Sequence, residues 1–256
     1  MSEWNPLNSR NYRRLLVILA LLGLPLWMIW PWVKVAWKAM NVKMTGKKTV
    51  ADRLEEYGLI VEQRLAESFR AVGTAFPPRQ LVFIGLKEEK RLELFVPDAS
   101  GSWRLLKSYP ILAASGKAGP KLRAGDRQVP EGLYRIELLN PNSLYHLSLR
   151  VNYPNEFDRA QAAEEGRTSL GGDIMIHGNE LSIGCLAMGD EAAEDLFVLA
   201  ARTGLENIRV ILAPRDLRSG KWPVAESGQA PWIDELYRQI RDEMQMFRSL
   251  DQDAKR

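Results

Sequence analysis

The spacing of apolar residues changes along the chain, and each spacing predicts a different kind of element. Residues 15–33 are apolar and carry no charge, which is about the length that a helix needs to cross a bilayer. Trp27, Trp30 and Trp32 gather toward the end of this run, as aromatic residues do at a membrane interface. No clear cleavage site for a signal peptide follows. We therefore expect a tail over residues 1–14 and an uncleaved transmembrane anchor.

A juxtamembrane segment over residues 34–78 comes next, and its second part has the period of an α-helix. Apolar side chains recur at helical spacing from Thr49 to about Gly73. Thr49 and Asp52 have the pattern of a capping box at the start of this helix. We expect the helix to pack on the domain that follows it.

From residue 81 onward the period of the apolar positions is two, which predicts β-strands. A helix is expected from Asp190 to about Thr203, and residues 216–256 hold a loop and an amphipathic helix from Pro231 that we expect to dock on the domain. The strands are expected over residues 81–86, 91–96, 103–109, 132–138, 145–153 and 208–213. Together these elements predict one domain over residues 79–215.

The candidate chemistry is concentrated between Ile174 and Asp190. This stretch holds the only cysteine, Cys185, and one of the two histidines, His177. The apolar residues before His177 predict a short buried strand that delivers the imidazole to a loop. A nearby imidazole can take the proton of a thiol, and an imidazolium would lower the pKa of Cys185 well below that of a free thiol. The alternative is a buried structural cysteine with an unrelated histidine.

The order of residues in this stretch resembles a known signature. His177-Gly178, followed by Ser182, Gly184 and Cys185, resembles the active-site motif of the L,D-transpeptidase catalytic domain (YkuD) family of cell-wall enzymes. The usual motif has a longer gap and a second histidine where this chain has Ile183. Both departures are similar to the YafK-like branch of murein L,D-transpeptidases. The likeness extends upstream through residues 119–134 and 151–160 and covers roughly residues 79–215.

The resemblance implies a fold and a mechanism. The fold is a mostly-β, mixed β-sandwich of the L,D-transpeptidase type with peripheral helices. Cys185 is the implied nucleophile on a diaminopimelate residue of a peptidoglycan stem peptide, and His177 is its base. Backbone N–H groups around Gly184 and Cys185 are expected to hold the oxyanion, with Gly178 and Ser182 as supporting residues. A backbone carbonyl near Gly178 is the expected orienting acceptor for the imidazole.

Other polar residues are weaker candidates. Arg159, Arg123 and Lys121 are candidates for binding substrate carboxylates, but each has an aspartate close by in the sequence with which it could pair instead. His146 is expected on a solvent-exposed face of a strand or at a cleft. No metal or other cofactor is expected, because two distant histidines and one cysteine do not make a zinc site.

Three functions remain open at this point. The first is a transpeptidase that transfers the acyl group of a stem peptide to an amine. The second is a hydrolase of the same family that detaches a lipoprotein from peptidoglycan. The third is an inactive module that binds the cell wall, against which the retained Cys185 and His177 argue.

Charge excludes little about the partners and leaves orientation open. The 35 basic and 32 acidic residues are nearly balanced, so a nucleic-acid partner is not indicated. Basic residues flank the anchor on both sides, and their excess after it would place the domain in the cytoplasm. The implied substrate lies outside the inner membrane. We therefore expect a single-pass inner-membrane protein with its catalytic domain in the periplasm.

Overall fold

The computed structural model describes residue 33 and residues 47–182, 184–220, 222 and 230–247. The predicted tail over residues 1–14 and all but the last residue of the predicted anchor lie outside this part of the chain. No helix among the described residues is both long and apolar enough to cross a membrane. The described residues from Lys47 onward form one compact unit.

A single sheet organises this unit, and its strands run in the order β3-β2-β1-β9-β5-β6-β7-β8-β4. The strands are β1 Leu81–Leu86, β2 Arg91–Pro97, β3 Trp103–Pro110, β4 Ala113–Ala114, β5 Gly132–Asn140, β6 Ser148–Val151, β7 Met175–His177, β8 Leu186–Ala187 and β9 Ile208–Ala213. The helices are α2 Val50–Val72, α3 Glu156–Glu164, α4 Asp190–Thr203 and α5 Trp232–Met244.

The fold is a mixed sheet with peripheral helices, as expected, but the sheet is continuous. The first part of β5 pairs with β9 and its last part pairs with β6. An irregular register between Ile136 and Leu138 bends β5 between these two partners. The expected two-sheet sandwich is therefore corrected to one sheet that curls into a half-barrel.

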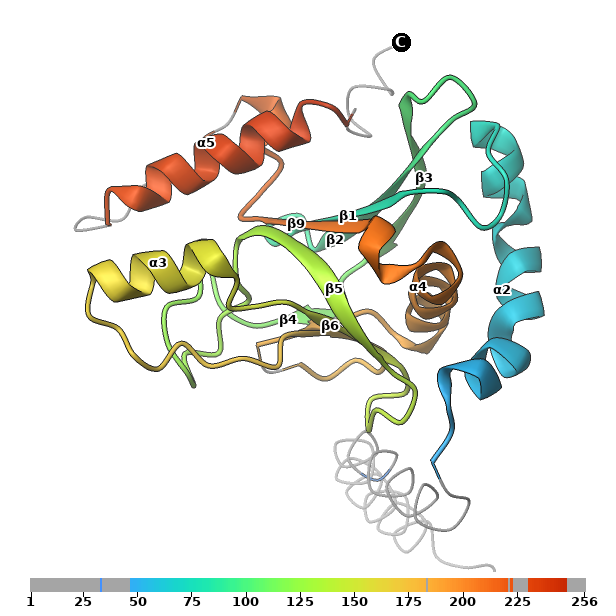
Figure 1. Ribbon diagram of the computed structural model, residues 1–256, viewed down its shortest axis with the longest axis horizontal. Helices are drawn as coiled ribbons and strands as arrows, with labels where there is room; N and C mark the ends of the chain where they lie inside the picture. Colours follow the sequence, from blue (N-terminus) through green and yellow to red (C-terminus); the bar gives the residue numbers. More distant parts are fainter. Residues whose placement is uncertain (1–32, 34–46, 183, 221, 223–229, 248–256) are drawn as a thin grey trace, which may run out of the picture. The chain divides into compact units, whose positions relative to one another are not determined.

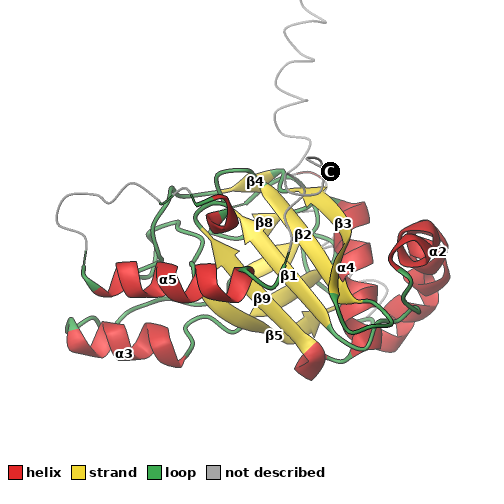
Figure 2. Cartoon of the chain, turned by 90° about the horizontal axis from the view of Figure 1, so that it is seen from above, coloured by secondary structure: helices red, strands yellow, loops and turns green. Residues whose placement is uncertain are grey.

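Helices cover both faces of the first part of the sheet, which explains why β1 is buried throughout. Leu81 and Phe83 point into a core that includes side chains of α2 and α4, whereas Val82 and Ile84 point into a second core under α5. Figures 1 and 2 show α4 against the sheet, α2 outside α4, and α5 on the opposite side. A strand with two covered faces has no polar side, so it is apolar at successive positions.

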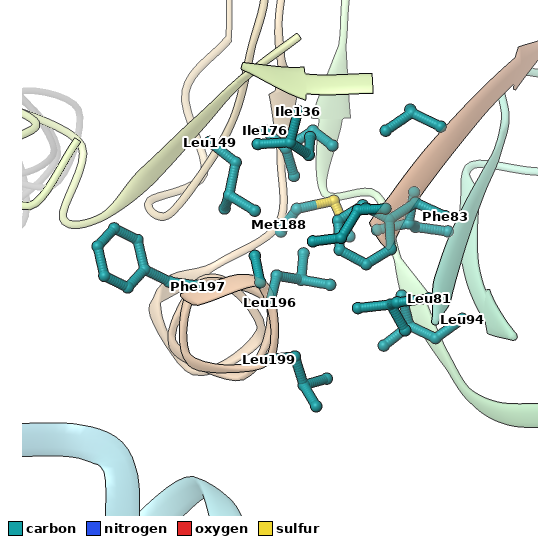
Figure 3. Packing of buried hydrophobic residues seen from close by; sticks show 14 of the residues in the cluster. Leu81, Phe83, Leu94, Ile136, Leu149, Ile176, Met188, Leu196, Phe197 and Leu199 are labelled. Carbon is teal, nitrogen blue, oxygen red and sulfur yellow. The ribbon is translucent and has the colours of Figure 1, made fainter. Parts of the chain in front are cut away.

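The larger core also joins the two parts of the curled sheet (Figure 3). The strands of the first part and those of the second part both contribute buried side chains to it, and the segment that contains α4 contributes the rest. The labelled members in Figure 3 are Leu81, Phe83 and Leu94 from the first part, Ile136, Leu149 and Ile176 from the second, and Met188, Leu196, Phe197 and Leu199 from the segment around α4. The strands of the second part, which include β7 and β8, are therefore held against α4 and the first strands by one apolar core.

Most predicted boundaries of the elements are confirmed. The helix expected from Thr49 is α2, with the expected capping box between Thr49 and Asp52 and a left-handed Gly73 at its end. The strand expected over residues 145–153 is confirmed only for Ser148–Val151. Its first residues form turns instead, because His146 has a positive φ of 73° that a strand does not accommodate.

Candidate active site

Two adjacent parallel strands carry the predicted pair of residues. His177 is the last residue of β7, which confirms the predicted buried strand before it. Cys185 directly precedes β8, and β8 pairs with β7 so that Ala187 lies beside His177. Met175 N–H donates to Cys185 Sγ over 3.4 Å. In this register Cys185 is level with Met175, so the sheet places Cys185 and His177, eight positions apart in the chain, on neighbouring strands and two register positions apart.

The imidazole of His177 is buried, with 3% of the residue exposed. Its Nδ1 lies 2.6 Å from the carbonyl oxygen of Gly178, which is the backbone acceptor expected from the sequence. Because a carbonyl only accepts, Nδ1 carries the hydrogen and Nε2 keeps a lone pair. Burial lowers the pKa of His177, so the neutral ring is a base with a defined accepting nitrogen.

The thiol of Cys185 is half-buried and has local backbone partners. Sγ donates to the carbonyl oxygen of Asp173 over 3.6 Å. Burial raises the pKa of Cys185, so the expectation of a lowered thiol pKa is wrong for this structure. Burial disfavours the charged forms of both Cys185 and His177. The resting pair is therefore a neutral thiol and a neutral imidazole.

The two backbone N–H groups expected to hold an oxyanion already have acceptors. Gly184 N–H donates to Ser115 Oγ over 2.5 Å, and Cys185 N–H donates to Ser182 Oγ over 3.1 Å. Ser182 Oγ also donates to the carbonyl oxygen of Cys185, so its hydroxyl stabilises the turn. A substrate oxyanion at this place has to displace these hydroxyl acceptors.

Ser115 is a site residue that the sequence motif does not contain. Its hydroxyl accepts from Gly184 N–H and donates to the carbonyl oxygen of Arg127 over 2.6 Å. It directly follows β4, which pairs with β8 at the far edge of the sheet. Only the pairing of β4 with β8 brings Ser115 to Gly184, and no spacing in the sequence signals it.

Gly178 has a packing role that explains why this position is a glycine. A Cβ there would lie 2.7 Å from Asp190 Oδ1 and 2.8 Å from the carbonyl oxygen of Tyr145. Its N–H donates to the carbonyl oxygen of Leu147 over 3.1 Å. The N–H of Gly178 is therefore used within the fold, while its carbonyl orients His177.

The three candidate substrate-binding cations differ in their surroundings. Lys121 is buried and pairs with Asp126 over 2.5 Å, so the ion-pair alternative describes it. Its positive charge still opposes the rise in the pKa of Cys185. Arg159 is exposed and donates to the carbonyl oxygen of Pro154. Arg123 is exposed, and its role as a carboxylate binder stays a prediction.

In the part of the chain that the structure describes, no three His, Cys, Asp or Glu side chains are grouped so that they could hold a metal ion.

Residues 79–210 match the family model of YkuD, the L,D-transpeptidase catalytic domain. The chain belongs to this family. The match includes both His177 and Cys185. The site therefore lies within the part of the chain that the L,D-transpeptidase family model covers.

The similar proteins extend this comparison. The chain is 40% identical over 113 residues to the putative L,D-transpeptidase YafK of Escherichia coli K12, and equally to that of Escherichia coli O157:H7. The aligned region is 43% of this chain and 43% of each relative, so the match spans less than half of the relatives' length.

The similarity to solved structures is weaker. The helical cell shape determining protein Pgp2 of Campylobacter jejuni is 23% identical with a TM-score of 0.43, over 52% of this chain and 47% of its own. Bd1075 of Bdellovibrio bacteriovorus is 20% identical with a TM-score of 0.39, over 65% of this chain and 55% of its own.

Proposed function

We propose that this protein is a membrane-anchored cysteine acyltransferase that acts on peptidoglycan stem peptides at diaminopimelate. The observation that carries the proposal is the parallel pairing of β7 with β8, which places His177 and Cys185 on neighbouring strands, two register positions apart. The His177 tautomer supports it, because Nε2 keeps the lone pair that a general base needs. Membership in the L,D-transpeptidase family supplies the substrate class.

In the first half of the reaction, Cys185 Sγ attacks the carbonyl carbon of the scissile peptide bond and its proton passes to His177 Nε2. The carbonyl oxygen becomes an oxyanion, for which the N–H groups of Gly184 and Cys185 are the nearest candidate donors. The C–N bond then breaks, and His177 returns the proton to the leaving amine. The product is a thioester on Cys185.

In the second half, an amine or water attacks the thioester carbonyl and His177 accepts the proton of that nucleophile. The C–S bond breaks and Cys185 leaves as a thiol after it regains the proton. An amine acceptor gives a new amide bond, which is a cross-link or an attached protein. Water gives the free carboxylate, which is the hydrolytic outcome.

The proposed location is the inner membrane, with the catalytic domain in the periplasm. The apolar run over residues 15–33 and its tryptophans support an anchor. The substrate class supports the periplasmic side, because peptidoglycan lies outside that membrane. A peptidoglycan-linked lipoprotein is the proposed protein partner, as the acceptor in transfer or the product released by hydrolysis.

The test is incubation of the full chain, in mild detergent, with purified sacculi and analysis of the products by mass spectrometry. New amide-linked species identify transfer, and shortened stems or released peptides identify hydrolysis. Cys185→Ser should abolish both, because a serine hydroxyl is far harder to deprotonate with the same base. Sacculi that stay unchanged with the wild-type chain would refute the proposed function.

A further inference from the structure

The aromatic ring of Tyr145 lies against the imidazole of His177. The ring centroids are 4.9 Å apart and the planes meet at 36°. Tyr145 is half-buried, and it comes from the turn before β6 rather than from β7. The hydrogen bond to Gly178 restrains one edge of the imidazole, and Tyr145 restrains its face. The ring of His177 is thus held from two directions.

The turn that carries Tyr145 has a strained residue beside it. His146 has a φ of 73°, in the left-handed region that costs free energy for a residue other than glycine. Such a conformation persists where the surroundings fix it. His146 Nε2 lies 2.9 Å from Glu194 Oε1 of α4, and its ring meets that of Tyr57 of α2 edge-on at 5.4 Å.

The same turn packs directly on the backbone next to His177. A Cβ on Gly178 would lie 2.8 Å from both the carbonyl oxygen of Tyr145 and the Cβ of His146. Glu194, the partner of His146, also pairs with Arg64 of α2 over 3.0 Å. The position of the turn is therefore fixed from both α4 and α2, which lie side by side in Figures 1 and 2.

We propose that Tyr145 is a positioning residue for His177, and that the contacts of His146 with Glu194 and Tyr57 hold the turn that carries Tyr145. This inference rests on the proposed function in one respect, the role of His177 as the general base. Tyr145 keeps Nε2 in the orientation in which it can accept the thiol proton of Cys185. A small misplacement of a catalytic group can lower the rate about a hundredfold.

The test uses two readouts on the full chain in mild detergent. The chain has two histidines, so ¹⁵N-histidine labelling and long-range ¹H–¹⁵N spectra report the tautomer of His177 directly. Turnover of purified sacculi gives kcat and KM. The variants are Tyr145→Ala, Tyr145→Leu as a better-packed replacement, and Tyr145→Phe. Leu144→Ala is the matched control, because Leu144 is exposed on the same turn.

In Tyr145→Ala we expect a roughly tenfold to hundredfold loss in kcat with little change in KM, and a mixture of His177 tautomers. Tyr145→Leu should show the same direction of change if Tyr145→Ala does not fold. Tyr145→Phe should keep most of the wild-type kcat, since it keeps the aromatic ring. Leu144→Ala should behave as wild type. A folded Tyr145→Ala or Tyr145→Leu variant with unchanged kcat and an unchanged His177 spectrum would overturn the inference.

The two proposals fail in distinguishable ways. A wild-type chain that leaves sacculi unchanged refutes the proposed function whatever the spectra show. The tautomer of His177 then still tests whether Tyr145 positions the ring. If Tyr145→Ala and Tyr145→Leu both turn over sacculi at the wild-type rate and both show one His177 tautomer, the proposed function stays intact and the role of Tyr145 is refuted.

Discussion

At the scale of single residues, burial sets the protonation states of the site. It raises the pKa of Cys185 and lowers that of His177, so both groups rest in their neutral forms. The thiol donates to the carbonyl oxygen of Asp173, and the proton has to move to His177 only when the substrate is attacked. General-base catalysis within the complex describes this pair better than a resting thiolate–imidazolium ion pair.

The first prediction follows from this resting state. Alkylation of Cys185 by iodoacetamide in the folded chain should rise with pH only above the range of an ordinary cysteine, because burial raises its pKa. His177→Ala should leave that profile nearly unchanged, yet slow acylation by substrate roughly a hundredfold or more. An alkylation midpoint at a pH well below the free-thiol pKa of roughly 8.5 would show a thiolate–imidazolium ion pair instead.

The residues of the site could be predicted only as far as the motif reaches. Cys185, His177 and the Gly178 carbonyl follow from a short stretch of sequence; the structure pairs His177 with that carbonyl and places Cys185 on the neighbouring strand. Ser115 and Tyr145 come from other parts of the chain, and only sheet pairing and the left-handed turn at His146 place them. The protonation states depend on burial, which the local sequence does not specify.

At the scale of elements, the first turn of α3 holds a half-buried carboxylate, Asp158. Asp158 accepts from Asn155 N–H over 2.9 Å, which completes the capping box of α3. The hydroxyl of Tyr134 on β5 also lies 3.2 Å from Asp158. Burial raises the pKa of Asp158 to about 6. One side chain therefore caps a helix and ties it to the sheet while its charge is disfavoured.

The second prediction concerns the pH dependence of stability. The folded state holds the Asp158 proton up to a higher pH than the unfolded state, so the free energy of unfolding should fall as pH rises from about 4 to 6. The fall from this group is at most about 3 kcal/mol, since one pKa unit is about 1.4 kcal/mol. Asp158→Asn should lose this component in urea unfolding.

Glu156→Gln is the control for this prediction, because Glu156 is an exposed acid in the same first turn of α3. It should keep the wild-type pH dependence. Equal slopes for wild type and Asp158→Asn between pH 4 and 6 would show that Asp158 does not titrate as its burial implies.

Element boundaries were predictable where local signals agree with the tertiary structure. Thr49 and Gly73 bound α2 because capping and left-handed termination are local properties. The residues before β6 alternate as a strand would, but His146 leaves the strand to reach Glu194. At α4, the structure confirms Asp190 as the first helical residue, and its Oδ1 accepts from Asn179 N–H over 2.8 Å.

At the scale of the whole molecule, helices outside the predicted domain share its cores. Side chains of α2 pack in the larger core, and α5 covers the other face of the first strands. Tyr237 of α5 also donates to the buried Glu131 over 2.8 Å. The docking of the C-terminal helix was predicted from its apolar stripe, whereas the curl of the sheet depends on the bend in β5.

The third prediction concerns the orientation of the chain in the membrane. The excess of basic residues after residues 15–33 would place the domain in the cytoplasm, whereas the proposed substrate lies outside the inner membrane, and our expectation follows the substrate. A reporter that fluoresces only in the cytoplasm, fused after Arg256, should stay dark, and the same reporter on a cytoplasmic control protein should be bright. A bright fusion of this chain would place the domain in the cytoplasm and contradict its action on peptidoglycan.

The most direct test of the central claim is intact-protein mass spectrometry of the full chain, quenched in acid during turnover of purified muropeptides. We predict a covalent adduct with the mass of the acyl donor minus its leaving amine, located on the peptide that contains Cys185 and removed by hydroxylamine as a thioester is. Cys185→Ser should carry no such adduct and should not turn over. Turnover by Cys185→Ser, or an adduct on another residue, would contradict the account.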